Sequence, residues 1–262
     1  MVEKDVFAGI QYFIIDMDGT FYLDGQLIPG ALDFLKRVRE TGRDFCFFTN
    51  NSSNNVAVCR EKLRRMGCDV PAEKIVISTH VTIDYLRRHE AGKTVFLLGN
   101  ERLTADFSAA GIALTETDPD LVVLGFDTTL TYQKLWDACR FLMRGAGYIA
   151  THPDVNCPTA DGFMPDTGSM MALLKASTGR EPLVMGKPNR FTVEYLTHKL
   201  GCRKEALCFV GDRLETDILI GQQNGVPSAL VLTGVTDAAQ YAESPVRATV
   251  CAPSLGALGR YL

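Results

Sequence analysis

The sequence has no CxxC pair among its eight cysteines, and its four histidines show none of the spacings typical of metal ligands. These absences argue against a disulfide framework and against a zinc site. In a chain of 262 residues, the cysteines are expected to be reduced thiols in a cytoplasmic protein, most of them filling the core. No apolar run approaches the ~18 residues that a membrane span requires.

An excess of charge of one sign is also lacking. Lys and Arg number 27, Asp and Glu number 31, and the formal net charge is −4. A binding face for nucleic acid or an anionic membrane would need a basic surplus, so neither partner is expected. The hydrophobic fraction of 46% and charged fraction of 22% are those of a globular protein. The oligomeric state is open, with a homodimer as one option.

Several common site motifs are missing. There is no GxxxxGK[ST] loop, no GxGxxG after a predicted strand, and no convincing Ser-His-Asp set. An EF-hand could begin at Asp16, but its fifth and sixth positions are Thr20 and Phe21, and no Glu closes the loop. The sequence therefore argues against a P-loop NTPase, a dinucleotide-binding enzyme and a calcium-binding loop.

Short apolar runs alternate with amphipathic segments along the whole chain. The apolar runs predict strands at 12–16, 44–50, 74–78, 94–99, 121–126, 147–152, 182–186, 206–212, 228–234 and 248–252. The amphipathic segments predict helices at 29–42, 53–67, 80–91, 131–144, 189–200 and 214–224. Gly168-Ser169 before "MMALL" reads as one more helix start, and Trp136 is expected in the core. Continuous hydrophobicity in the strands predicts an α/β fold with parallel sheets covered by helices.

Reactive side chains follow four of these predicted strands. They are Asp16 and Asp18, then Thr49-Asn50-Asn51, then Gly186-Lys187-Pro188, and finally Gly211-Asp212 with Asp217 nearby. Each group alone is ordinary, as a polar strand exit, a turn or a helix start. Ligands in open α/β sheets bind beyond the carboxyl ends of the strands, so the four together predict one functional site.

The acids in this set predict a magnesium site. Residues two apart in an extended segment share a face, so Asp16 and Asp18 can address one point, and Asp212 adds a third hard oxygen donor. With Asp217, four carboxylates contribute −4, whereas Mg²⁺ and Lys187 contribute +3. The remaining negative charge would oppose a phosphate dianion. One acid is therefore expected to be protonated with substrate bound, and it could serve as a general acid.

These residues resemble the four motifs of the haloacid dehalogenase superfamily of phosphohydrolases. "DMDGT" matches the first motif, "FFTNN" the second, "GKP" the third and "GDRLETD" the fourth. The long segment between the second and third motifs resembles the NagD/para-nitrophenyl-phosphatase branch, which carries a class II α/β cap there. The resemblance implies a Rossmann-like, doubly wound parallel core over 1–80 and 184–262, with a smaller α/β cap inserted at 81–183.

The resemblance also implies catalytic roles. Asp16 would be the nucleophile that forms an aspartyl phosphate, and Asp18 would protonate the leaving oxygen and then activate water. Lys187 would neutralise the transferring charge and restrain Asp16. Asp16, the backbone carbonyl of Asp18, and Asp212 would hold Mg²⁺. Asp217 would orient metal-bound waters or Lys187.

Substrate binding is implied for residues of the first two motifs. Thr49 and Asn50 would hold phosphate oxygens, and Asn51 belongs to the same motif. Gly19 would leave backbone amides free to approach the phosphate. The cap departs from the branch pattern at Thr151-His152-Pro153-Asp154, where Asn often stands in place of His152, and at Pro165-Asp166-Thr167-Gly168-Ser169. His152 is expected to be packed or solvent-facing rather than to contact the leaving group.

The expected function is a Mg²⁺-dependent phosphomonoesterase acting on small phosphorylated metabolites, such as sugar phosphates or nucleoside monophosphates. Para-nitrophenyl phosphate would be an artificial substrate. A phosphotransferase or mutase using the same intermediate stays open as an alternative. A phospho-receiver signalling module, which also uses an acid cluster, a Thr and a Lys, is a more distant one. The physiological substrate cannot be named before the cap side chains are placed in space.

Overall fold

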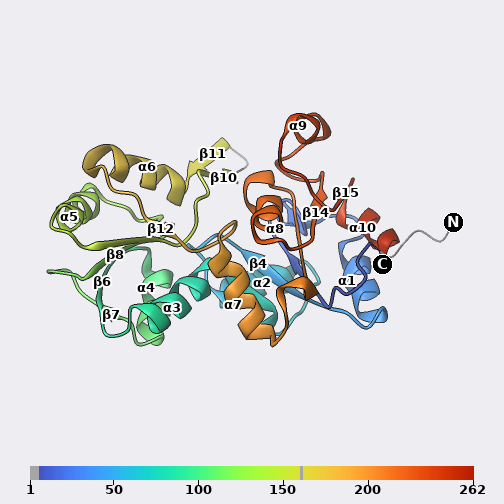
Figure 1. The fold of residues 1–262 in the computed structure, drawn as a ribbon, viewed down its shortest axis with the longest axis horizontal. Helices are drawn as coiled ribbons and strands as arrows, with labels where there is room; N and C mark the ends of the chain where they lie inside the picture. The colour runs from blue at the N-terminus through green and yellow to red at the C-terminus, as the bar shows by residue number, and fades with distance from the viewer. Residues whose placement is uncertain (1–5, 160–161) are drawn as a thin grey trace. The chain divides into compact units, whose positions relative to one another are not determined.

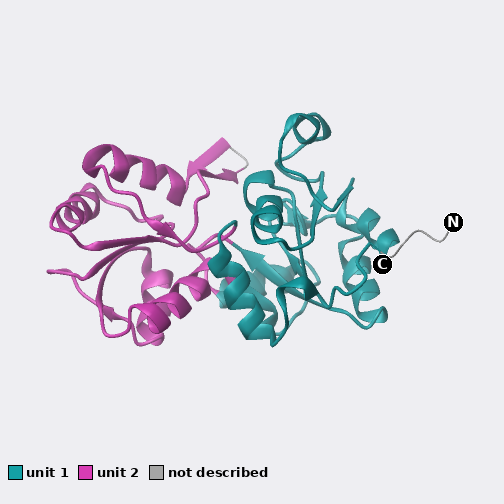
Figure 2. Cartoon of the chain, in the orientation of Figure 1, with its two compact units in different colours: residues 1–49, 56–76, 188–262 teal, residues 50–55, 77–187 magenta. Residues whose placement is uncertain are grey.

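The computed structural model describes residues 6–159 and 162–262, and the chain divides into two compact units. The first unit comprises residues up to Thr49, Val56–Val76 and Pro188–Leu262. The second comprises Asn50–Asn55 and Ile77–Lys187 (Figure 2). The assignment of catalytic core and cap to these units stays a prediction.

A six-stranded sheet forms the centre of the first unit. Its order is β15 (Val250–Ala252), β14 (Ser228–Val231), β13 (Leu207–Gly211), β1 (Tyr12–Ile15), β4 (Asp44–Thr49) and β5 (Ile75–Ile77). The strand β1 runs parallel to both neighbours, with Ile15 opposite Val210 on β13 and Phe47 on β4. Because Phe13, Ile14 and Ile15 are all buried, β1 is a central strand covered on both faces.

Helices flank this sheet. They are α1 (Ala31–Glu40), α2 (Val56–Arg65), α7 (Arg190–Leu200), α8 (Leu219–Asn224), α9 (Ala238–Glu243) and α10 (Leu255–Leu258), with a π-helical turn at Leu214–Ile218 leading into α8. The helix α1 buries Ala31, Phe34, Leu35 and Val38, the i, i+3, i+4, i+7 pattern of one apolar face. Phe34 packs edge-on against Phe13 of β1 with ring centroids 5.6 Å apart. A small hairpin, β2 (Tyr22–Leu23) and β3 (Gln26–Leu27), follows β1.

The second unit has its own five-stranded parallel sheet. The order is β12 (Leu183–Val184), β9 (Gly147–Ala150), β8 (Leu121–Leu124), β6 (Thr94–Leu98) and β7 (Ala113–Leu114). Figure 1 shows α5 (Tyr132–Met143) and α6 (Thr167–Thr178) over one face, with α3 (Ser78–His89) and α4 (Glu101–Ala109) over the other. An antiparallel hairpin, β10 (Asn156–Thr159) and β11 (Gly162–Pro165), precedes α6.

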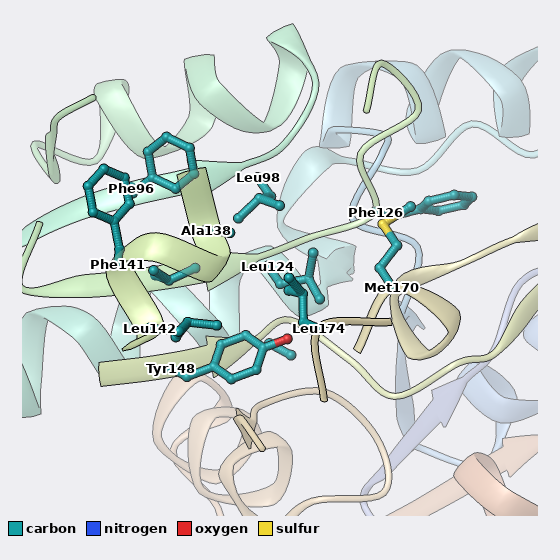
Figure 3. Close-up of a cluster of buried hydrophobic side chains, with 12 residues drawn as sticks. Phe96, Leu98, Leu124, Phe126, Ala138, Phe141, Leu142, Tyr148, Met170 and Leu174 are labelled. Carbon is teal, nitrogen blue, oxygen red and sulfur yellow. The ribbon is translucent and has the colours of Figure 1, made fainter. Parts of the chain in front are cut away.

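Apolar side chains from α5, α6 and one face of this sheet form one hydrophobic core of the second unit (Figure 3). Phe141 of α5 packs against Phe96 of β6 with ring centroids 5.0 Å apart. Trp136 does not join this core and is 55% exposed, so the prediction that it is a core residue is wrong. The buried residues of α5 are Ala138, Phe141 and Leu142, and position 136 falls on another side of the helix.

The predicted α/β fold class with parallel sheets is confirmed, and each predicted strand and helix segment contains an element of that type. The predictions missed α4, α9, α10, the short strand β7 and both hairpins. All eight cysteines are free thiols, but only four are buried, fewer than expected. In the described residues, no helix is both long and apolar enough to cross a bilayer.

Candidate active site

Three carboxylates converge where β1 and β13 end. Asp16 directly follows β1 and Asp212 directly follows β13, and the two strands are parallel neighbours whose carboxyl ends meet. The backbone N–H of Asp16 donates to the Val210 carbonyl at 2.8 Å, which extends the pairing by one residue. Carboxylate oxygens of Asp16, Asp212 and Asp217 lie within 4.8 Å of one another. The sequence predicted that acids follow these two strands, and the fold brings Asp16, Asp212 and Asp217 together.

Asp212 is fully buried in this group and is held by two donors. The Thr20 hydroxyl donates to its Oδ1 at 2.9 Å, and the Val235 N–H donates to its Oδ2 at 2.7 Å. Burial, and secondly the negative charge of Asp217, raise the pKa of Asp212 to about 6. Both causes oppose a negative charge on Asp212, and the carboxylates of Asp16 and Asp217 lie beside it.

Glycines let the backbone close tightly around these acids. Gly19 has a φ of +84°, and a Cβ there would lie 2.6 Å from Asp212 Oδ2. A Cβ on Gly211 would lie 2.0 Å from Asp217 Cγ. Hard oxygen donors in a close group with surplus negative charge fit a divalent metal ion.

The Asp18 side chain makes different contacts and is exposed. Its Oδ1 lies 3.1 Å from Lys62 Nζ, and its Oδ2 accepts a hydrogen bond from the Tyr22 hydroxyl at 2.8 Å. The Lys62 ammonium also sits 4.0 Å from the centre of the Tyr22 ring. Burial and, after it, the charge of Asp18 raise the pKa of the Tyr22 phenol well above its usual range. Nothing in the sequence pattern linked Lys62 to Asp18, because α2 lies more than 35 residues further along the chain.

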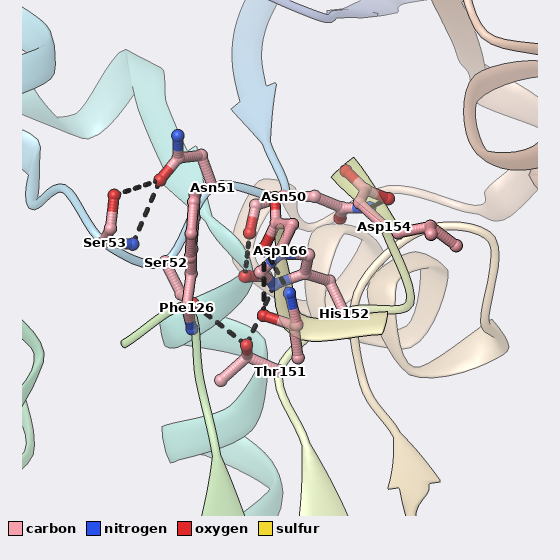
Figure 4. Close-up of polar contacts among 12 residues, drawn as sticks. Asn50, Asn51, Ser52, Ser53, Phe126, Thr151, His152, Asp154 and Asp166 are labelled. Carbon is pink, nitrogen blue, oxygen red and sulfur yellow. Dashed lines mark hydrogen bonds and ion pairs between the residues drawn. The ribbon is translucent and has the colours of Figure 1, made fainter. Parts of the chain in front are cut away.

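The remaining predicted site residues divide between the two units. Thr49 ends β4 in the first unit and is buried. Asn50, Asn51 and Lys187 belong to the second unit, with Lys187 only 2% exposed. The Asn50 side-chain amide is hydrogen-bonded to the backbone of Lys187. The Asn51 side-chain Oδ1 accepts from the Ser53 N–H at 3.0 Å and from the Ser53 hydroxyl at 2.6 Å. The Asn51 contacts form a local turn (Figure 4).

A buried polar network lies in the second unit beside these residues (Figure 4). His152 Nδ1 is 2.9 Å from the Thr151 hydroxyl, and His152 Nε2 is 2.9 Å from Asp166 Oδ1. The Thr151 hydroxyl is in turn 3.0 Å from the hydroxyl of Ser52, which accepts from the Phe126 N–H at 2.9 Å. His152 is fully buried, the packed one of the two positions expected for it. Oxygen and nitrogen atoms of His152, Asp154 and Asp166 also lie within 4.8 Å, but His152 and Asp166 bind each other directly.

Sequence reasoning gave no role to Ser52, Asp154 or Asp166. All three sit in segments that it had singled out: Ser52 beside the second motif, and Asp154 and Asp166 where the chain departs from the branch pattern. The sequence therefore already pointed to the segments that contain these residues. That indication became specific only when the fold joined Ser52 to Thr151 and Asp154 to Asn50, each about 100 positions apart, and Asp166 to His152, 14 positions apart.

Comparison with known proteins agrees with the motifs. A model of haloacid dehalogenase-like hydrolases matches residues 13–113, and a second model of hydrolases of this type matches residues 184–258. The chain is 34% identical to the dihydroxyacetone phosphatase of Corynebacterium glutamicum (strain R), over 90% of this chain and 86% of that protein.

Solved structures share the whole architecture. The 4-nitrophenylphosphatase of Thermotoga maritima is 46% identical, with a TM-score of 0.94, covering 97% of this chain and 98% of that one. A glycerol phosphate phosphatase from Mycobacterium tuberculosis, solved with calcium, is 31% identical with a TM-score of 0.89, covering 97% of this chain and 76% of that one. The chain therefore belongs to the haloacid dehalogenase-like hydrolases and resembles their 4-nitrophenylphosphatase (NagD-like) branch, as its motifs predicted.

Proposed function

We propose that this protein hydrolyses small phosphomonoesters through an aspartyl phosphate formed on Asp16. The observation that carries the proposal is the convergence of the Asp16, Asp212 and Asp217 carboxylates at the ends of two central strands. Such a group suits phosphoryl transfer, in which positioning and charge stabilisation account for most of the catalysis. The family membership and the phosphatase names of the relatives support the same reaction.

The reaction would proceed in two displacements. The Asp16 carboxylate attacks phosphorus, the bond from phosphorus to the leaving oxygen breaks, and Asp18 gives that oxygen its proton. Asp18, now a carboxylate, takes a proton from water, and the resulting hydroxide attacks the phosphorus of the aspartyl phosphate. Phosphate leaves and the Asp16 carboxylate is regenerated. For this role Asp18 must exchange its contacts with Lys62 and Tyr22 for contact with the leaving group.

We assign Mg²⁺ as the divalent ion. Asp16, the backbone carbonyl of Asp18, and Asp212 would hold it, and Asp217 would orient its waters or Lys187. Carboxylates, carbonyls and waters are the ligands that Mg²⁺ prefers. When bound, the ion would offset the negative charge of the phosphoryl group during transfer.

Other residues would bind the phosphate itself. The Thr49 hydroxyl, the backbone of the Asn50-Asn51 segment and the backbone at Gly19 would donate hydrogen bonds, and Lys187 would add a positive charge. In this assignment, 1–80 and 184–262 form the catalytic core, and 81–183 form a cap that selects the substrate and excludes water. A cytoplasmic location suits the eight free thiols. A homodimer stays an open option.

The names of relatives support a preferred substrate class. They include a dihydroxyacetone phosphatase, an acid sugar phosphatase and a glycerol phosphate phosphatase, so we propose a three-carbon or sugar phosphate as the natural substrate. Nucleoside monophosphates are the second class.

A phosphate-release screen tests the proposal. The purified protein is assayed against triose, sugar and nucleoside monophosphates and para-nitrophenyl phosphate, with Mg²⁺ and with excess EDTA. Release of phosphate that depends on Mg²⁺ is expected for at least the small phosphates. No release from any compound with Mg²⁺ present would overturn the proposal. Adding a free sugar acceptor separates hydrolysis from phosphate transfer, because transfer would yield a new sugar phosphate in place of free phosphate.

A further inference from the structure

The Asn50 side chain is bound to the backbone of Lys187. Asn50 is 4% exposed. Its Nδ2 donates to the Lys187 carbonyl at 3.0 Å, and its Oδ1 accepts from the Lys187 N–H at 3.0 Å. The side-chain amide thus pairs with both polar groups of one residue, as a neighbouring strand would. This fixes the peptide groups on both sides of the Lys187 Cα atom.

Asp154 reinforces the orientation that the Lys187 backbone gives the Asn50 amide. Asn50 Nδ2 also donates to Asp154 Oδ1 at 3.0 Å. An ionised carboxylate only accepts and a backbone N–H only donates, so the nitrogen must face Asp154 and the oxygen must face the Lys187 N–H. If the Asn50 amide were flipped, its oxygen would face the Asp154 carboxylate, and its NH₂ group would face the Lys187 N–H. The Lys187 backbone already disfavours the flipped amide, and Asp154 adds a second acceptor that holds the observed orientation more firmly.

Glycine at position 186 allows this close approach. A Cβ on Gly186 would lie 2.6 Å from Asn50 Oδ1, 2.8 Å from the Thr151 carbonyl oxygen and 2.9 Å from the His152 Cβ. The Gly186 N–H donates to that Thr151 carbonyl at 2.8 Å. The segments at 50, 151–154 and 186–187 are therefore joined by hydrogen bonds at one point, inside the second unit.

The contacts of Asn50 also limit what else it can do. Phosphate oxygens need donors, and both N–H groups of the Asn50 side chain have acceptors in the Lys187 carbonyl and Asp154. A phosphate contact from this side chain would require breaking one of those hydrogen bonds. The side chain is thus better suited to holding Lys187 than to holding substrate.

We propose that Asp154 is a positioning residue for the phosphoryl-transfer reaction, acting through Asn50 to fix Lys187. The inference rests on the proposed function, in which the Lys187 ammonium neutralises the transferring phosphoryl group. Asp154 would contribute to the rate without touching substrate. Misplacing a charged group by about 1 Å can cost on the order of 10²-fold in rate, which is the scale expected for loss of Asp154.

Kinetics of three variants test the proposal. Asp154→Ala should lower kcat by about 10- to 100-fold and leave KM nearly unchanged, because charge stabilisation is lost while substrate binding is kept. Asp154→Asn can still present a carbonyl oxygen to Asn50 and should recover most of kcat. Ser169→Ala is the matched control, because the Ser169 hydroxyl bonds the Val155 carbonyl of the same segment and not Asn50. Thermal unfolding of each variant shows whether it is folded.

Two kinetic results would overturn the inference. One is an Asp154→Ala variant that behaves like Ser169→Ala. The other is a raised KM with unchanged kcat, which would make Asp154 a substrate-binding residue.

Chemical labelling gives a readout that does not need phosphatase activity. Lys187 is 2% exposed and should react with acetic anhydride far more slowly than Lys36, whose side chain is 75% exposed. Asp154→Ala should speed the acetylation of Lys187, measured by mass spectrometry, and leave Lys36 unchanged. If Lys187 reacts equally slowly in the variant, the inference fails. If the wild-type protein releases no phosphate but labelling changes as expected, the proposed function fails and the structural link stands.

Discussion

His152 Nε2 lies 2.9 Å from Asp166 Oδ1, and both side chains are buried in the second unit. The two residues belong to segments on opposite sides of the β10–β11 hairpin, so their contact joins the end of β9 to the start of α6. A neutral ring with its proton on Nε2 satisfies this geometry. It donates to Asp166 and accepts from the Thr151 hydroxyl at Nδ1. The carboxylate of Asp166 also accepts from the Thr167 N–H at the first turn of α6.

Replacing His152 with Ala is expected to destabilise the protein by about 2–4 kcal/mol, because it leaves a cavity and removes a donor from a buried carboxylate. His152→Gln can still reach Asp166 with its Nε2 and should recover part of the loss. His152→Asn should recover less, because its side chain is shorter. Urea unfolding measures all three. An Ala variant within about 0.5 kcal/mol of wild type would contradict a structural role for this pair.

A Cβ at position 186 has no room. Gly186→Ala should lower both stability and kcat, because the new methyl group would lie 2.6 Å from Asn50 Oδ1 and would push Lys187 away. Gly259→Ala is the matched control, since its nearest neighbour would be 3.4 Å away, at the Arg37 side chain. Thermal unfolding and steady-state kinetics of both variants give the comparison. Equal behaviour of the two would show that the approach at Gly186 is not tight.

The buried Asp212 predicts an unusual pH dependence for the metal-free protein. Its pKa is raised to about 6, chiefly by burial, so between pH 4 and 6 the native state binds more protons than the unfolded chain. The contribution of Asp212 to the free energy of unfolding therefore falls as pH rises through this range. Other acids, such as Glu61, whose pKa Arg64 and Arg65 lower to about 2, contribute with the opposite sign.

The difference between wild type and Asp212→Asn isolates this contribution. In EDTA, the variant should gain stability relative to wild type as pH rises from 4 to 7, as measured by urea unfolding at several pH values. Added Mg²⁺ should stabilise the wild type at pH 7 more than at pH 5, because metal and proton compete for the same carboxylate. It should stabilise the variant little at either pH. If the difference in free energy of unfolding between wild type and Asp212→Asn did not change with pH, the raised pKa of Asp212 would be contradicted.

Much of the fold could be predicted because buried parallel strands are continuous apolar runs. The segment "FIID" predicts both the strand β1 and the acid at its end, and the same logic placed Asp212 after β13. The hairpins β2–β3 and β10–β11 were missed because their strands are only two to four residues long. Such short strands show no clear apolar run or alternation. Trp136 was misplaced because a large aromatic residue on an amphipathic helix was taken for a core residue, although the buried face is set by Ala138, Phe141 and Leu142.

The side-chain partners in the site were harder to predict than its members. The reactive residues at the strand ends could be identified from the sequence. The contact of Lys62 with Asp18 and that of Asp154 with Asn50 depend on how separate segments meet in the fold. Long-range contacts of this kind leave no periodic pattern in the sequence. Any polar residue would fit the local helix or loop at each of these positions, so the local sequence does not reveal the distant partner.

In the proposed mechanism, Asp16 is the nucleophile of a Mg²⁺-dependent phosphatase. Asp16→Asn keeps the size of the side chain but removes the charge and the nucleophilic oxygen. The most direct measurement compares phosphate release by purified wild type and Asp16→Asn, with saturating Mg²⁺ and the best substrate of the screen. We expect phosphate release at the background rate for the variant, with its fold intact by circular dichroism. Phosphate release by the variant at a rate near that of wild type would contradict the proposed mechanism.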